Sequence, residues 1–398
     1  MPASTPDPSF GVYIHWPFCE SKCPYCDFNS HVRDTIAQKS WRDAYLTEFD
    51  AAALEFGKRP VDTVFFGGGT PSLMDPATVA AILEGIDTMF GFADAAEVTL
   101  EANPSSAESK NFSVLRDAGV NRLSLGIQSF DDKALSFLGR THDAVTARTA
   151  LSIAAETFPR VSFDLIYALP GQSRSAWHSE LAEALSLGTG HLSAYQLTLE
   201  TGTPFFHAAQ AGRLVLSGSD AAAALYDITQ ELCDAAGLPA YEVSSHARPG
   251  EQSCHNLLYW RSCDWAGVGP GAHGRRTSVL GRAATTQLRS PEDWIVAVNA
   301  NGSGRESEDL LDANQVVEEA LLMGLRLTEG IDDARFCALT GRSIEECFGS
   351  GLVELSDAGL LAWDGTALSV TLAGRQVLDR VVETLAFVAD ANGLTTPS

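Results

Sequence analysis

Three cysteines near the N-terminus have a spacing suited to metal binding. Cys19, Cys23 and Cys26 form a C-x3-C-x2-C pattern. Thiolates are preferred ligands of iron–sulfur clusters, and three of them leave one iron of a 4Fe–4S cube open for chemistry. A structural zinc site completed by His15 or His31 is the alternative. The pattern therefore predicts a 4Fe–4S cluster first and a zinc ion second.

Glycine and polar residues follow several apolar runs that are typical of buried strands. The glycines 67–69 follow one such run, and Glu101, Gln128 and Asp164 lie at the ends of others. Parallel barrels place their chemistry at the carboxyl ends of the strands. Successive glycines also let a ligand approach the backbone N–H groups. We therefore expect these residues to share one site.

The apolar pattern predicts an α/β fold with alternating strands and helices over residues 11–200. Short β-branched and aromatic runs alternate there with segments of helical period. Six such units fit a partial (β/α)6 barrel of the TIM type better than a complete eight-unit barrel. The expected strands are 12–15, 63–66, 98–101, 122–126, 161–166 and 191–197. The expected helices are 41–56, 77–90, 109–118, one or two within 132–155, and 175–187.

The C-terminal part predicts a second, smaller α+β domain. Three helical patterns, a hairpin signal at Asp364-Gly365 and a last helix follow one another as in a winged helix. Residues 312–398 carry 5 Arg, no Lys and 14 Asp or Glu, so we expect a docking or lid role in place of DNA binding. The expected segments are a disordered tail at 1–10, the barrel at 11–200, a barrel extension at 201–300, a linker at 301–311, the winged-helix-like domain at 312–390 and a tail at 391–398.

Composition restricts the partners and the compartment. The chain has 27 Lys and Arg against 51 Asp and Glu, a formal net charge of -24, which repels nucleic acids and anionic lipids. Eight cysteines in 398 residues are too sparse for a disulfide scaffold and favour a reducing compartment. We therefore expect a cytoplasmic protein without a signal peptide, membrane span or nucleic-acid partner, which reaches membranes only through other proteins.

Further motifs resemble those of the radical S-adenosylmethionine (SAM) enzymes, which carry CX3CX2C after the first strand of a partial barrel. The GGGTP string at 67–71 resembles the SAM-binding motif of this superfamily, in the form found in coproporphyrinogen-dehydrogenase-like proteins. The resemblance continues through LEANP at 100–104, SLGIQSF at 124–130, LGRTH at 138–142 and FDLIYALPGQ at 163–172. It implies a 4Fe–4S cluster on the three cysteines and SAM as cofactors.

The resemblance also implies which residues bind SAM. A SAM molecule on the cluster would be contacted by Tyr13, Gly68 and Glu101. A second SAM, as in the anaerobic dehydrogenase, would use the matching positions Tyr25, Gly69, Thr70, Gln128, Arg140 and Asp164. Carboxylates can accept hydrogen bonds from amino or ribose hydroxyl groups, and an arginine can pair with a carboxylate.

Two features are similar to the haem chaperones of this family. Phe28 stands where the anaerobic dehydrogenase has a further cysteine, and HNLLYW at 255–260 resembles the HNxxYW motif of the chaperones. An imidazole can ligate haem iron, and tyrosine and tryptophan offer flat apolar faces to a porphyrin. The resemblance thus implies haem binding by His255, Asn256, Tyr259 and Trp260. A hydrogen-bonded structural histidine is the alternative.

The expected function is therefore that of a haem chaperone. It would bind haem, a 4Fe–4S cluster and SAM, and transfer the haem to acceptor haemoproteins such as membrane-bound respiratory enzymes. The alternative is an oxygen-independent coproporphyrinogen III dehydrogenase, which decarboxylates propionates to give protoporphyrinogen IX. The sequence leaves the oligomeric state open, a homodimer included.

Overall fold

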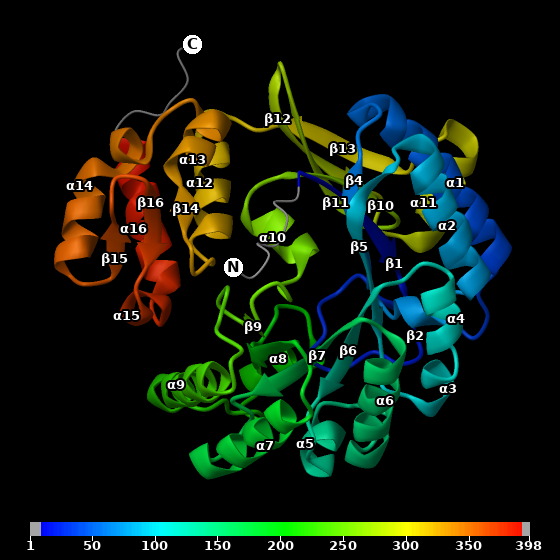
Figure 1. Cartoon of the computed structure of the whole chain (residues 1–398), viewed down its shortest axis with the longest axis horizontal. Coiled ribbons are helices and arrows are strands. Elements are labelled where there is room, and N and C mark those ends of the chain that lie inside the picture. Colours follow the sequence, from blue (N-terminus) through cyan, green and yellow to red (C-terminus); the bar gives the residue numbers. More distant parts are fainter. Residues whose placement is uncertain (1–8, 392–398) are drawn as a thin grey trace.

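The computed structural model describes residues 9–391. A large curved sheet with helices on its outer face forms the main body, and a smaller, mainly helical domain lies beside it (Figure 1). The fold is thus α/β with a separate C-terminal domain, as predicted.

The six expected strands form the centre of the sheet. They pair in parallel in the order β1-β4-β5-β6-β7-β8. Because the six strands run in the same direction, their carboxyl ends meet at one edge, where a ligand can reach them all. Their bounds are β1 (Phe10–Trp16), β4 (Val61–Gly68), β5 (Phe92–Ala102), β6 (Arg122–Gln128), β7 (Arg160–Tyr167) and β8 (His191–Gln196).

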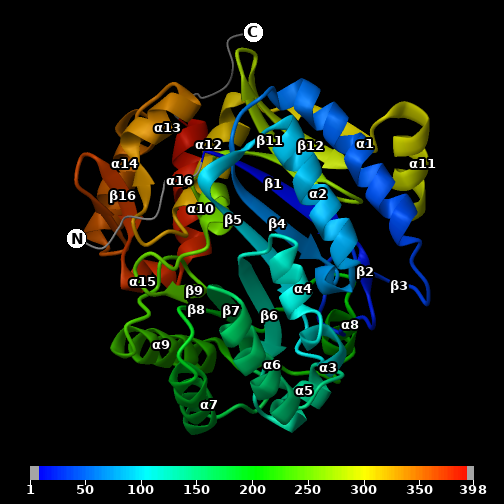
Figure 2. The same ribbon diagram turned by 45° about the vertical axis from the view of Figure 1, so that its right-hand side comes forward.

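Helices follow these strands and lie against the outer face of the sheet (Figure 2). Local capping explains where several of them begin. The Asp75 carboxylate accepts from the Ala77 N–H at 2.9 Å, with Pro76 as first helical residue, a favourable start. The bounds are α1 (Gln38–Phe56), η1 (Pro71–Leu73), α2 (Pro76–Met89), α3 (Ser106–Ser109), α4 (Phe112–Asp117), α5 (Asp132–Phe137), α6 (Ala144–Thr157), α7 (Arg174–Ser186), α8 (Pro204–Gln210) and α9 (Ser219–Ala235).

The main core fills the space between the sheet and its helices. Phe10 and Ile14 of β1 are fully buried there, and each such side chain contributes about 1.5–3 kcal/mol through burial. The core continues into the later part of the chain, since Trp41 of α1 stacks on Trp294 with ring centroids 5.7 Å apart. Trp294 belongs to α11 (Pro291–Asn301). The barrel and its extension therefore share one core.

Five further strands widen the sheet on both sides. Strand β10 (Asp264–Val268) pairs in parallel with β1, and β11 (His273–Ser278), β12 (Gly281–Gln287) and β13 (Arg305–Leu310) continue from it antiparallel. On the other side, β9 (Ser245–Ala247) pairs with β8. The linker predicted at 301–311 is therefore wrong, because most of it is strand β13. As an edge strand, β13 carries charged and exposed side chains, which give it the composition of a linker.

The C-terminal domain has the predicted winged-helix-like order and its own core. The Asp364 carboxylate accepts from the Ala367 N–H at 2.8 Å and Gly365 has a φ of 89°, as the predicted hairpin turn requires. The bounds are α12 (Ala313–Gly324), β14 (Ile331–Asp332), α13 (Asp333–Thr340), α14 (Ile344–Asp357), β15 (Leu361–Trp363), β16 (Ala367–Val370), α15 (Leu372–Arg375) and α16 (Leu378–Ala391).

The first strand and the last helix reach into the segments predicted as tails. Phe10, predicted to lie in the N-terminal tail, begins β1, and α16 continues to Ala391. The rest of the two predicted tails, 1–8 and 392–398, lies outside the described residues. Within residues 9–391, every helix is too short or too polar to cross a bilayer.

Candidate functional site

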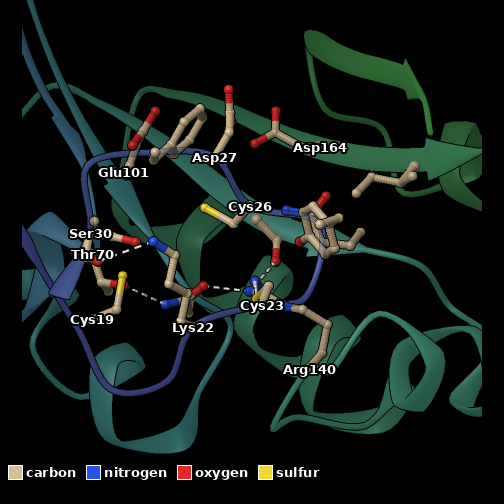
Figure 3. A pocket seen from close by; sticks show the side chains of 18 of the residues that line it. Cys19, Lys22, Cys23, Cys26, Asp27, Ser30, Thr70, Glu101, Arg140 and Asp164 are labelled. Atoms are coloured by element: carbon tan, nitrogen blue, oxygen red, sulfur yellow. Dashed lines mark hydrogen bonds between the residues drawn. The ribbon is translucent and has the colours of Figure 1, made fainter. Parts of the chain in front are cut away.

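A cavity of about 580 Å³ lies at the carboxyl edge of the parallel strands, beside the cysteine loop (Figure 3). The loop leaves through β2 (Phe18–Cys19) and returns through β3 (His31–Val32), which pair with each other. The structure thus gathers nearly all residues predicted for the cluster and SAM. Those that line the cavity are Cys19, Cys23, Tyr25, Cys26, Gly68, Gly69, Thr70, Glu101, Gln128, Arg140 and Asp164.

The three thiols share this cavity, and polar side chains contact two of them. The Thr70 hydroxyl lies 3.4 Å from Cys19 Sγ, and Arg140 Nη1 lies 3.3 Å from Cys23 Sγ. Burial raises the pKa of the Cys19 and Cys26 thiols. No three His, Cys, Asp or Glu side chains of the described residues converge as a metal-ligand set.

The zinc alternative lacks a fourth ligand in this arrangement. The ring nitrogens of His15 lie 3.1 Å from the Tyr13 hydroxyl and 2.9 Å from the Asn29 carbonyl oxygen. His31 Nε2 lies 3.2 Å from Asn29 Oδ1, and neither imidazole lines the cavity. A set of three thiols suits an iron–sulfur cluster with one open iron better than tetrahedral zinc.

Gly68 and Gly69, at the end of β4, allow close contact with β1 and with the cysteine loop. A Cβ atom on Gly68, which has a φ of 108°, would lie 2.5 Å from the His15 ring. A Cβ atom on Gly69 would lie 2.5 Å from the backbone oxygen of Phe18. A side chain at Gly69 would therefore push the glycine loop away from the cysteine loop, and one at Gly68 would push it away from β1. The glycines keep the backbone exposed to a ligand in the cavity.

Two half-buried carboxyl groups, Glu101 and Asp164, face the cavity (Figure 3). Burial and the charge of Asp164 raise the pKa of Glu101 to about 8, although the Gly68 N–H donates to its Oε2 at 3.2 Å. Burial also raises the pKa of Asp164 to about 6, opposed by a hydrogen bond from Ser193 and by nearby arginines. Such carboxyl groups are suited to a ligand with a positive charge, which restores their ionised form.

Arg140 provides a positive charge in the same cavity. Its Nη2 donates to the Gly126 carbonyl oxygen at 2.9 Å and to the side chain of Asn103. Asn103 in turn donates to the Thr70 hydroxyl at 3.1 Å. Sequence reasoning missed Asn103, although its place directly after a strand end, within LEANP, was a usable signal. The cavity therefore offers groups of both signs, as a zwitterionic ligand requires.

Tyr13 differs from the other residues predicted for SAM, because it does not line the cavity. Its hydroxyl pairs with His15, and its ring centroid lies 6.4 Å from that of His255. Burial and the charge of Glu101 raise its pKa. Tyr13 is thus a neighbour of both the cavity residue Glu101 and the predicted haem motif.

The predicted haem motif forms α10 (Cys254–Trp260), which lies on the inner side of the curved sheet (Figure 1). Both ring nitrogens of His255 are engaged, Nδ1 at 2.8 Å from the Thr63 hydroxyl and Nε2 at 2.7 Å from the Tyr259 hydroxyl. Glu97 accepts from the backbone N–H of His255 at 3.1 Å. Burial lowers the pKa of His255 to about 3. In this arrangement His255 is a neutral, hydrogen-bonded core residue.

The four motif residues do not converge on one surface. Trp260 lies at the junction with the C-terminal domain, where the Arg326 guanidinium sits 4.5 Å from its ring centroid. Asn256 is half-buried, and Ser253 caps its backbone N–H at 3.3 Å. None of the four residues lines the cavity beside the cysteines. The two predicted sites are therefore separate.

A partial parallel barrel with a CX3CX2C loop beside a glycine-lined cavity defines a radical SAM protein. The sequence model described as "Radical SAM superfamily" matches residues 13–184, and the one described as "HemN C-terminal domain" matches residues 311–377. The superfamily uses SAM and a 4Fe–4S cluster, and the three thiols, the glycine loop and the groups of both signs suit these cofactors.

Similarity over nearly the whole chain defines the family more closely. The chain is 36% identical to "Heme chaperone HemW" of Escherichia coli, over 94% of this chain and 98% of that protein. It is 33% identical to the protein of the same name from Bacillus subtilis, over 92% and 96%. It is also 40% identical to the mouse "Radical S-adenosyl methionine domain-containing protein 1, mitochondrial", over 94% and 86%. The chain belongs to the HemW family of radical SAM proteins.

A solved structure agrees with this fold. The E. coli coproporphyrinogen III oxidase HemN, described as a radical SAM enzyme, superposes with a TM-score of 0.78, over 96% of this chain and 91% of that one. The sequences are only 22% identical, so this likeness concerns the fold alone.

Proposed function

We propose that this protein is a haem chaperone, which binds haem and passes it to acceptor haemoproteins. The observation that carries the proposal is the similarity, over nearly the full length of both chains, to proteins named as haem chaperones. The structural likeness to HemN does not favour decarboxylation, because at 22% identity it reflects the shared fold.

In this proposal Cys19, Cys23 and Cys26 hold a 4Fe–4S cluster. Bound there, the cluster supplies an iron with an open coordination position for SAM. The ionised Glu101 and Asp164 attract the positive groups of SAM, and Arg140 attracts its carboxylate. Tyr25, Gly68, Gly69, Thr70 and Gln128 complete the walls. Tyr13 lies outside the cavity and contributes to the site through its proximity to Glu101.

Haem is proposed to bind at helix α10, through the motif residues His255, Asn256, Tyr259 and Trp260. Iron coordination by His255 requires one ring nitrogen to exchange its bond to Thr63 or to Tyr259 for the metal, while the other nitrogen can keep its hydrogen bond. We place the protein in the cytoplasm and infer that contacts with acceptor proteins bring it to membrane-bound respiratory enzymes. Its net charge of -24 opposes direct binding to anionic lipids.

A transfer experiment tests this function. Protein loaded with one equivalent of haem is mixed with the haem-free form of an acceptor, and the acceptor's haem spectrum is followed. We expect transfer in direct contact and none across a dialysis membrane. Equal transfer in both arrangements would mean that haem merely dissociates. Formation of protoporphyrinogen IX from coproporphyrinogen III under anaerobic conditions would instead establish the dehydrogenase.

Variants of His255 separate its structural role from iron ligation. His255→Ala leaves the buried hydroxyls of Thr63 and Tyr259 without their partner, so we expect a loss of about 2–4 kcal/mol in the free energy of unfolding, measured in urea. His255→Gln can retain hydrogen bonds and should lose less. If His255 ligates iron, haem affinity falls in both variants. Normal haem binding by the glutamine variant would show that the histidine is structural.

A further inference from the structure

A second cavity, of about 440 Å³, lies where helix α10 meets the C-terminal domain. Its walls come from the end of α10 and the following turn on one side, and from α12, β14, α13 and β16 on the other. We call it the junction cavity. Its volume falls in the range of about 300–1,000 Å³ that is usual for small-molecule sites. Trp260 is the residue of the predicted haem motif that lines it.

The Trp260 indole is held rigidly beside the cavity and has an unused donor. The Arg326 guanidinium lies 4.5 Å from its ring centroid, and Arg326 Nη2 pairs with Glu242 at 3.1 Å. The buried Nε1–H of Trp260 has no hydrogen-bond partner within the described part of the chain. This N–H is shielded from the cavity as well as from solvent, so the part of Trp260 that a ligand can contact is its ring.

The C-terminal domain contributes apolar residues to the cavity wall, together with the charged Asp332 and Arg335. Leu327, Ile331 and Phe336 are buried residues of the C-terminal domain that line the cavity. Arg261 also lines it and makes a two-point ion pair with Glu329, at 2.8 and 3.0 Å. The Glu329 side chain is 53% exposed, so another carboxylate can replace it at Arg261 at little cost. These features suit a flat apolar molecule that carries carboxylates.

The junction cavity lacks iron ligands. Its lining residues, all within the described part of the chain, include no His, Cys, Met or Tyr. Haem proteins usually hold the iron through one of these side chains. A porphyrin in this cavity would therefore be recognised by its ring and its propionates and not by its metal.

We propose that the junction cavity binds the porphyrin of haem, with the ring against Trp260 and the apolar wall and a propionate at Arg261, without a protein ligand to the iron. This inference rests on the proposed haem-chaperone function and adds the position and the chemistry of recognition. It does not depend on whether His255 ligates the iron at another stage.

Iron-free protoporphyrin IX is the probe that tests this inference. The full-length protein is titrated in parallel with protoporphyrin IX and haem, followed by absorbance and tryptophan fluorescence. We expect one molecule of either to bind, with dissociation constants within about tenfold of each other. Trp260→Leu and Arg261→Gln should each weaken protoporphyrin binding about tenfold, the scale of one aromatic or charged contact. Arg261 pairs with a glutamate whose side chain is largely exposed, so its variant should fold.

Trp363→Leu is the matched control, because Trp363 packs against the core of the same domain but does not line the cavity. It should bind protoporphyrin like the wild type. Tight haem binding without protoporphyrin binding, or displacement of protoporphyrin by palmitate at equal affinity, would overturn the inference. If Trp260→Leu and Arg261→Gln bind protoporphyrin like the wild type and the protein still transfers haem, the inference about the junction cavity is overturned and the chaperone function stands. Absence of binding by both haem and protoporphyrin would refute the function as well.

Discussion

Anaerobic reconstitution of the Cys23→Ser variant is expected to yield protein without a stable 4Fe–4S cluster. Three cysteines supply all protein ligands of the proposed cluster, and a serine hydroxyl is a far weaker ligand for iron than a thiolate. Cys23 is also the thiol that Arg140 contacts at 3.3 Å, so its replacement alters one contact between the loop and the rest of the cavity wall. Iron and acid-labile sulfide per chain, together with the electron paramagnetic resonance signal after reduction, measure the effect.

Cys337→Ser is the control for this experiment. Cys337 is exposed on α13, in the C-terminal domain, and should leave the cluster intact. A full complement of iron and sulfide in Cys23→Ser would show that the cysteine loop is not the cluster site. Wild-type protein that takes up zinc and no sulfide would revive the zinc alternative.

The parallel part of the fold could be predicted because its strands are buried on both faces. Such strands are continuous apolar runs, as in 63–66, and their carboxyl ends necessarily meet at one edge. The joint position of Glu101, Gln128 and Asp164 follows from this geometry without knowledge of any contact. The cavity that contains them therefore agrees with the sequence prediction.

Other features depend on contacts between distant parts of the chain. Strands β11 to β13 form one flank of the sheet and carry many polar residues, and this polarity hid them. Glu48 illustrates the point: it accepts from the Gly304 N–H at 2.6 Å and from the Ser303 hydroxyl at 2.9 Å. A buried carboxylate that is 256 residues from its partner cannot be inferred from local patterns. It fixes the segment predicted to be a linker.

The residues of the haem motif are close together in sequence, but the geometry of the helix places them on different faces of α10. His255 and Tyr259 are four residues apart, so they share one face of α10 and can hydrogen-bond to each other. Trp260 is five residues from His255 and lies on a different face. A motif that looks continuous in sequence thus contributes one residue pair to the barrel interior and one aromatic ring to the domain junction.

The stability of the cluster-free protein is expected to fall as the pH rises from about 5 to 8, because of Glu101. The pKa of Glu101 is about 8 in the folded protein against an ordinary value of 4.5 for glutamate. The folded state therefore binds more protons than the unfolded state within this interval, and unfolding becomes easier as the pH increases. The full pKa difference of Glu101 corresponds to a loss of ~5 kcal/mol in the free energy of unfolding. Urea unfolding from pH 5 to pH 9 measures it.

Glu101→Gln removes this titration and should be more stable than the wild type, by an amount that grows by about 2–3 kcal/mol between pH 6 and pH 8. The exposed Glu306 provides the matched control, and Glu306→Gln should follow the wild type at every pH. With SAM bound, the wild type should be the more stable of the two proteins. The positive charge of SAM favours the ionised Glu101, and the neutral amide of Glu101→Gln cannot provide this interaction. Cluster-loaded wild type should therefore bind SAM more tightly than Glu101→Gln at pH 7. Parallel stability curves for wild type and Glu101→Gln would show that this carboxyl is already ionised in the empty cavity and that its burial is compensated by other groups.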